Sequence, residues 1–126
     1  MSKKQKRIKQ RALAGVLGKA LTRRSRGVCE LCESRDQSRV YELSPFPTEP
    51  ELERSLMACG RCRSWLEQRE AGGVDAHFLS SAIWSEEPAV QLAAARILLC
   101  VDLDEHPWAQ EALEAVQVDV VTGEFI

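Results

Sequence analysis

The chain has 126 residues, of which 44% are hydrophobic and 29% charged, an ordinary composition for a soluble globular protein. This length allows one compact domain with an arm and excludes two full cores. No apolar run approaches the roughly 20 residues that cross a bilayer, and no secretory leader pattern is present. We therefore expect a cytoplasmic protein without a membrane partner. In that compartment thiols stay reduced, and paired cysteines more often bind metals than form disulfides.

The net charge of −2 conceals two oppositely charged regions. Residues 1–27 hold ten lysines and arginines and no acidic residue, whereas all 19 acidic residues lie beyond them, against seven arginines. Such a basic arm can bind nucleic acid, because lysine and arginine displace condensed counterions from phosphate. It could equally dock on its own acidic body or stay solvated. The candidate partner-contact residues are Lys3, Lys4, Lys6, Arg7, Lys9, Arg11, Arg23 and Arg24.

Residues 8–21 predict an amphipathic helix within this arm. Its apolar residues fall near one helical face and its lysines and arginines lie elsewhere. Such a stripe has to pack on the rest of the domain or on a second copy of the chain, so a homodimer through this helix is one candidate assembly. The stripe consists of Ile8, Leu13, Val16, Leu17, Ala20 and Leu21.

Two Cys-x-x-Cys pairs are the candidate metal-binding motif of the sequence. Cys29 and Cys32 form the first, Cys59 and Cys62 the second, and 26 residues separate the pairs. Two residues between thiolates suit a tight turn whose amides point at the sulfurs, and four thiolates complete a tetrahedral shell. We expect one structural Zn²⁺ here, with an iron site on the same ligands and a redox dithiol as alternatives. Four cysteines close the shell, which leaves no position for water or substrate.

Around these pairs the sequence predicts an α+β, mostly helical fold. A strand over 39–43 and a proline-broken loop over 44–50 separate the pairs. The second pair, which contains Gly60, opens a helix that we expect to stop at Gly72-Gly73, where glycine can take the left-handed conformation. A cysteine turn, a hairpin and a second cysteine turn opening a helix describe a treble clef. The predicted organisation is a basic amphipathic helix or arm (1–27), a treble-clef zinc module (28–71) and a helical region with a short extended C-terminus (72–126).

The helical region has its own start signals and its own core helix. Ser85 or Glu87 could cap a helix whose almost wholly apolar body, 89–101, is the candidate for the central buried helix. A last helix is predicted over 108–116. Residues 118–126 predict an extended segment with a turn at its Thr-Gly pair.

The fifth cysteine, the two histidines and the three tryptophans are weaker candidates for a functional role. Cys100 falls within the apolar helix, where a free thiol behaves as a small buried hydrophobe. His77 and His106 lie too far from a cysteine pair to be ligands, so we expect them to cap helices or bond to the backbone. Core or groove packing is the expected role of the three tryptophans, Trp65, Trp84 and Trp108.

A familiar combination is formed by Gly27–Cys32, Val40–Leu43, Ile83–Gln91 and the pair Cys59 and Cys62. Together they resemble the PhnA family, small bacterial proteins named after an alkylphosphonate-utilisation operon. The resemblance covers about residues 20–117, and the third stretch is its most specific part. It implies an N-terminal zinc-binding module with no established reaction. Typical members continue into a small β-barrel-like C-terminal domain that has no counterpart in this sequence, so nothing that resides there carries over.

A weaker similarity connects the sequence with HNH endonucleases, which use the same treble clef. There, adjacent histidines after the first cysteine turn act as base and metal ligand. Tyr41 and Glu42 stand at the matching positions here, and no histidine follows closely after Cys62. Without an imidazole to activate water or hold a catalytic metal, the sequence does not support phosphodiester hydrolysis.

Three hypotheses for function follow. The favoured one is a non-enzymatic zinc-binding protein that recognises a macromolecule, either protein or nucleic acid. The second is an enzyme or accessory factor acting on a small phosphorus compound, which needs an open pocket where acids, a histidine and an arginine converge. The third is thiol-based or zinc-based regulation, in which oxidation or metal loss unfolds the cysteine turns. Candidates for the pocket of the second hypothesis are Asp75, His77, Glu86 and Arg96.

Overall fold

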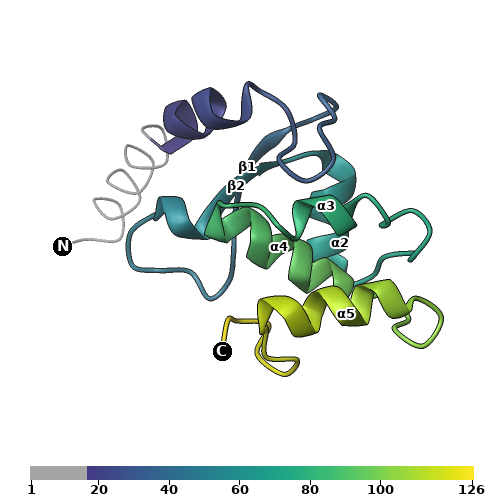
Figure 1. Ribbon diagram of the computed structural model, residues 1–126. Coiled ribbons are helices and arrows are strands. Elements are labelled where there is room, and N and C mark those ends of the chain that lie inside the picture. Colours follow the sequence, from purple (N-terminus) through teal and green to yellow (C-terminus); the bar gives the residue numbers. More distant parts are fainter. Residues whose placement is uncertain (1–16) are drawn as a thin grey trace.

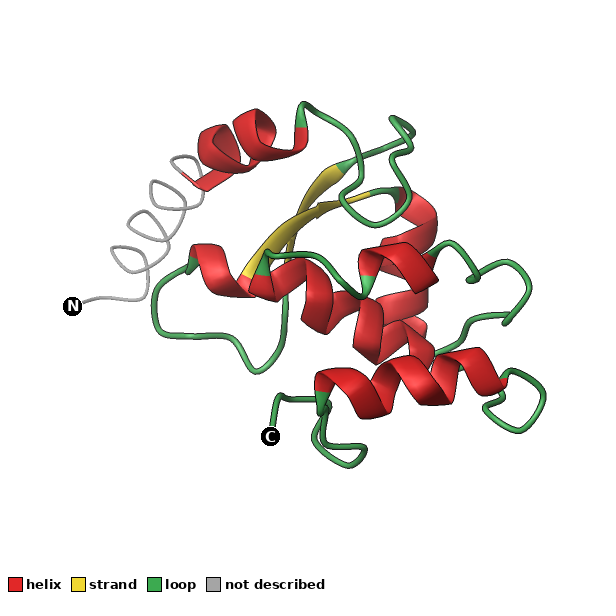
Figure 2. Ribbon diagram, viewed as in Figure 1, coloured by secondary structure: helices red, strands yellow, loops and turns green. Residues whose placement is uncertain are grey.

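A computed structural model describes residues 17–126 of the chain. Helices surround one small sheet, and Figure 2 shows the two strands side by side with helices on several sides of them. This mixture agrees with the predicted α+β class. Within the described residues, no helix is long and apolar enough to cross a membrane. After helical residues 17–25 the elements are β1 (Arg39–Glu42), η1 (Leu52–Arg54), β2 (Ser55–Ala58), α2 (Gly60–Gln68), α3 (Leu79–Ala82), α4 (Pro88–Leu98) and α5 (Pro107–Val116) (Figure 1).

The sheet is an antiparallel pair that joins the two cysteine turns. Val40 lies opposite Met57 in the register, and all four residues of β2 are buried, whereas β1 begins exposed. The free edge of β2 is occupied by Glu30. The N–H of Glu30 donates to the carbonyl of Met57 (2.9 Å), and the N–H of Met57 donates to the side-chain carboxylate of Glu30 (2.9 Å). β2 is therefore bonded on both edges, which fixes the first cysteine turn beside the strand that leads into the second.

α4 is the central buried helix, as predicted. It begins at Pro88, where the missing N–H of proline costs no helical hydrogen bond. Glu87 occupies the N-cap position without a side-chain cap; the hydroxyl of Ser85 instead accepts the N–H of Glu87 (3.1 Å). α4 contacts η1, β2, α2, α3 and α5 (Figure 1). One hydrophobic cluster extends from Cys29 to Val118, so the predicted regions 28–71 and 72–126 share one core.

α2 ends earlier than predicted. Its last helical residue is Gln68, and Arg69 takes the left-handed conformation (φ 54°) with its N–H donating to the carbonyl of Trp65. The expected stop at Gly72-Gly73 is therefore wrong. Gly73 has a different role, because a Cβ at this position would overlap the ring of His106. The glycine permits the loop after α2 to pass closely against the start of α5.

The C-terminal residues form a narrow turn against α4. Val118 and Phe125 pair across an isolated antiparallel bridge, and Gly123 supplies a positive φ of 67° at the turn. Glu124 then accepts hydrogen bonds from Arg54 (2.8 and 2.9 Å) and from Arg96 (2.7 Å). One carboxylate thus fastens the end of the chain to η1 and to α4. The predicted turn is present, and the only extended pairing within 118–126 is the isolated bridge.

Glu124→Gln should remove an acid-sensitive part of the stability. Hydrogen bonds from Arg54 are the main cause that holds the pKa of Glu124 below its ordinary value of 4.5, although burial opposes them. A carboxylate whose pKa is depressed in the folded state contributes stability above its unfolded pKa, and loses it as the pH falls through the folded-state pKa. Thermal melts at several pH values should show a steeper loss below about pH 4.5 for the wild type than for the variant. Parallel profiles for the two proteins would count against this carboxylate as the group that titrates.

Candidate metal centre

The first cysteine turn is shaped by its own backbone. The N–H of Cys29 donates to the carbonyl of Ser34 (2.8 Å), and the N–H of Glu33 donates back to the carbonyl of Cys29 (2.8 Å). Glu33 adopts a left-handed conformation (φ 65°), which closes the turn. The result is a loop that brings Cys29 and Cys32 to one side.

The second cysteine turn is the start of α2. Cys59 follows β2 directly and is the N-cap residue, and its sulfur accepts the N–H of Cys62 (3.5 Å). Gly60 permits close packing of the loop that leaves the first turn. Its N–H donates to the carbonyl of Asp36 (3.4 Å), and a Cβ there would lie 3.1 Å from the side-chain oxygen of Gln37. The two turns are therefore held against each other by backbone contacts as well as by the cysteines.

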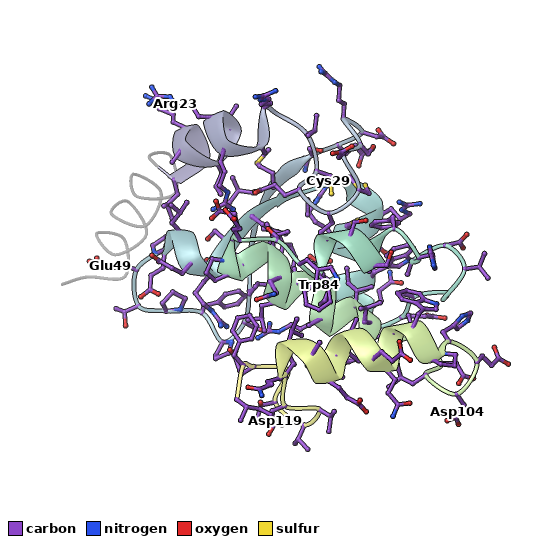
Figure 3. The ribbon with its side chains drawn as sticks, viewed as in Figure 1. Arg23, Cys29, Glu49, Trp84, Asp104 and Asp119 are labelled. Atoms are coloured by element: carbon purple, nitrogen blue, oxygen red, sulfur yellow. The ribbon has the colours of Figure 1, made fainter. Side chains whose placement is uncertain are left out.

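All four predicted ligands come together. Their sulfur atoms lie within 4.8 Å of one another, and the sulfurs of Cys32 and Cys59 are 3.5 Å apart. A tetrahedron with metal–sulfur bonds of about 2.3 Å has edges of about 3.8 Å, so these separations fit a four-thiolate shell. No disulfide links them. Cys32 is half-buried and the other three cysteines are buried; Figure 3 shows Cys29 beside other sulfur atoms under its turn. The cluster can hold a metal ion.

The electrostatics of the four thiols favour a cation. A hydrogen bond from Cys62 is the main cause that lowers the pKa of Cys29 to about 4, and burial opposes it. The same hydrogen bond, together with burial, raises the pKa of Cys62 far above the ordinary thiol range. Burial also raises the pKa of Cys32. Thiolates packed this closely repel one another, so a divalent cation bound among them would stabilise their deprotonated form.

Arg61 stands at the half-buried side of the cluster. Its guanidinium carbon lies 4.9 Å from the ring centre of Trp65 and 5.0 Å from that of Phe78, and these two rings stack at 6.0 Å. Burial lowers the pKa of Arg61, but the sulfurs outweigh it, led by a hydrogen bond to Cys32, and the net shift is upward. The aromatic pair thus fixes a positive charge next to the thiols. The sequence places Arg61 inside the second turn, but its aromatic support could not be foreseen.

The candidate partner-contact residues divide into three groups. Lys3, Lys4, Lys6, Arg7, Lys9 and Arg11 lie outside the described residues, as does most of the predicted helix 8–21. Arg23 is exposed and projects from the helical residues 17–25 (Figure 3). Arg24 instead turns inward and pairs with Glu30 (2.8 Å) and Glu87 (3.2 Å). Of the described pair, Arg23 is thus accessible to a partner, whereas Arg24 docks on the acidic body, which was the alternative interpretation of the arm.

The four residues considered for a catalytic pocket do not line one cavity. Arg96 lines a cavity beside α4 to which Asp75, His77 and Glu86 do not contribute. The ring of His77 instead packs edge-on against Trp108, with ring centres 4.8 Å apart.

Other single-residue expectations hold only in part. His106 is the N-cap residue of α5 by position, but its side chain makes no cap hydrogen bond. Trp65 and Trp108 pack on the core as expected, whereas Trp84 is 59% exposed. Cys100 lies beyond the end of α4 and is half-buried rather than buried. His106, Trp84 and Cys100 lie at or shortly beyond helix ends, where pattern-based expectations are weakest.

No protein-family model matches this sequence, and no curated protein or solved structure matches it either.

Proposed function

We propose that the chain is a non-enzymatic zinc protein, a four-cysteine treble clef whose single metal ion organises a surface that recognises a macromolecule. One observation carries the proposal: four sulfurs from two cysteine turns, the second of which starts α2, lie within 4.8 Å of one another. Four thiolates suit Zn²⁺ and complete its preferred shell, so the ion would build structure instead of binding substrate. The similarity to the PhnA family, which implies such a module, stays a prediction.

The order of the elements supports the treble clef. A cysteine turn, the β1–β2 pair and a second cysteine turn that opens α2 follow one another along the chain. The N-terminus of α2 lies at Cys59 and Cys62, so its helix dipole would offset part of the negative charge of a tetrathiolate site. Arg61 would add a full positive charge at Cys32.

The recognition surface begins at the helical residues 17–25. Leu21 is fully buried and Arg24 is ion-paired, so this segment is anchored on the body. Its outward side carries Lys19 and Arg23, both exposed, and continues the basic sequence of residues 1–16. An anchored helix with cations on its free face suits an acidic partner, either nucleic acid or an acidic protein surface.

Removing residues 1–16 should weaken partner capture several-fold and leave the zinc content unchanged. The deletion takes away six of the ten cations of the arm but keeps Leu21 and Arg24, which anchor the remaining helix. Capture from a cell lysate by the full and the shortened chain, with and without nuclease treatment, measures the effect. Loss of the captured material after nuclease would identify nucleic acid, and its persistence would identify protein. Equal capture by both chains would exclude the arm from recognition.

A further inference from the structure

A cavity of about 490 Å³ lies apart from the cysteine cluster. Its walls come from four segments far apart in the sequence: the end of β1 with the loop after it, the C-terminal end of α2, the last part of α4 and the turn at 120–123. Small-molecule pockets typically have volumes of about 300–1,000 Å³. The cavity is therefore large enough for a small organic ligand, and none of the candidate metal ligands lines it.

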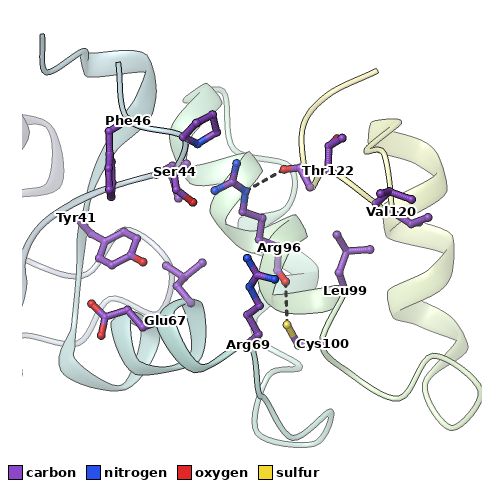
Figure 4. A pocket seen from close by; sticks show the side chains of 15 residues that line it. Tyr41, Ser44, Phe46, Glu67, Arg69, Arg96, Leu99, Cys100, Val120 and Thr122 are labelled. Atoms are coloured by element: carbon purple, nitrogen blue, oxygen red, sulfur yellow. Dashed lines mark hydrogen bonds between the residues drawn. The ribbon is translucent and has the colours of Figure 1, made fainter. Parts of the chain in front are cut away.

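Two guanidinium groups face this cavity. Figure 4 shows Arg69 and Arg96 directed toward the same space as the hydroxyl of Tyr41. Arg96 is held by hydrogen bonds to the carbonyl of Gly123 (2.9 Å) and to Glu124 (2.7 Å). Such a fixed arginine offers its remaining N–H groups in a defined direction, which suits planar recognition of an oxyanion.

Positive charge exceeds negative charge at the cavity, because Arg69 and Arg96 both line it and Glu67 is the only carboxylate among its lining residues. Glu124 is shared between Arg96 and Arg54, so one carboxylate serves two guanidinium groups. Among residues 17–126, the side chain of Arg69 makes no hydrogen bond or ion pair. Burial lowers the pKa of Arg96, and repulsion from Arg54 and Arg69 contributes to the same shift. An anion placed between Arg69 and Arg96 would relieve that repulsion.

Tyr41 supplies a neutral donor at the same place. Burial and then the nearby carboxylate of Glu67 raise the pKa of Tyr41, so its phenol stays protonated at neutral pH and can donate a hydrogen bond. The residue comes from β1, opposite Leu56 in the register, which fixes the ring at the edge of the core.

Apolar side chains gather at the mouth of the cavity. Phe46 is 68% exposed, Val120 73% and Val121 90%, and all three line it. Leu66 and Leu99, which are partly buried, form its inner wall. Scattered exposed apolar residues are ordinary, but a group of them around one cationic cavity indicates a ligand with an apolar part.

We propose that this cavity binds a small organic oxyanion, whose carboxylate or phosphoryl head accepts hydrogen bonds from Arg69 and Arg96 while its apolar body packs against Phe46. The two arginines provide charge and direction, and the apolar mouth selects against bare inorganic ions. The cavity shares no lining residue with the four clustered cysteines, so its ligand binding can be tested separately from the identity of the metal.

Phenyl phosphate and benzoate are suitable probes, with benzamide as the neutral counterpart of the same size. Titration of the full chain, followed by calorimetry and by the amide NMR signals of the lining residues, should show saturable one-site binding of at least one anion. Arg69→Gln should weaken that binding at least about tenfold, as expected when a charged hydrogen bond is lost. Gln117 already adopts a left-handed conformation like that of Arg69, so glutamine suits the backbone there.

Arg35→Gln is the matched control, because it removes the same charge from an exposed arginine that does not line the cavity. Its affinity for the probes should equal that of the wild type. Phe46→Ala should weaken phenyl phosphate but leave the binding of inorganic phosphate unchanged. Tighter binding of phenyl phosphate or of benzoate would identify the head group. Absence of saturable binding, equal affinity for benzamide, or equal losses in the two arginine variants would overturn the proposal.

Discussion

Cys62→Ser is expected to yield a protein that holds no stoichiometric metal and is largely unfolded. Cys62 is fully buried at the first turn of α2, so it belongs both to the ligand cluster and to the core. Structural zinc contributes on the order of 10 kcal/mol or more to folding, and a domain of this size has a total stability of about 5–15 kcal/mol. Loss of one ligand from a four-thiolate shell therefore removes most of the free energy of unfolding. Circular dichroism melts together with elemental analysis of metal content measure both effects.

Cys100→Ser provides the matched control for this experiment. It makes the same chemical change at a half-buried thiol outside the cluster, whose sulfur donates to the carbonyl of Arg96 (3.4 Å). Serine can make that hydrogen bond, so metal content and melting temperature should stay close to those of the wild type. A Cys62→Ser protein that melts like the Cys100→Ser protein would show that the cluster does not hold the fold together.

Arg24→Met is expected to lower the free energy of unfolding by about 3 kcal/mol, because it leaves a buried carboxylate without its partner. The guanidinium of Arg24 forms a bidentate pair with Glu30 (2.8 and 2.9 Å) and also reaches Glu87 (3.2 Å). The side chains of Arg24 and Glu30 are only 17% and 9% exposed, so solvent cannot replace the lost charge. Methionine keeps the length of the apolar stem. Denaturant unfolding measures the difference.

Arg23→Met is the natural comparison, since it removes the neighbouring exposed arginine and should change the stability by less than about 0.5 kcal/mol. The double variant Arg24→Met, Glu30→Gln should lose less free energy of unfolding than the two single variants lose together, because it no longer contains an unpaired buried carboxylate. Equal losses for Arg24→Met and Arg23→Met would mean that the pair is screened like a surface ion pair, and that Arg24 is available to a partner after all.

The cysteine cluster could be predicted from the sequence because its signal is local. Two residues between cysteines suit a tight turn, and two such turns that pack against each other supply all four ligands of a tetrahedral site. α4 was equally accessible, because an apolar run of that length after a proline has few other places in a small fold. In both cases neighbouring residues already contain the information.

The features that could not be predicted from the sequence depend on contacts between residues that are far apart in the chain. Charge alone could not show that Arg24 pairs with Glu87, 63 positions away, while Arg23 stays outside. The end of α2 was misplaced because a left-handed arginine stops the helix before the glycines. The cavity of Tyr41 and Arg96 joins a strand to a helix and a C-terminal turn, so it exists only once α4 is packed. No pattern in the neighbouring sequence indicates these contacts.

Native mass spectrometry of the purified chain, followed by elemental analysis, tests the proposed metal centre most directly. We expect one zinc ion per chain, with Cys29, Cys32, Cys59 and Cys62 protected from alkylation until a chelator removes the metal. Cys100 lies outside the cluster, so it should react with the alkylating agent before the chelator is added. A folded chain that carries no metal and whose four clustered thiols react freely would show that the cluster is not a metal centre. A coloured protein that carries iron would show that the ion is not zinc.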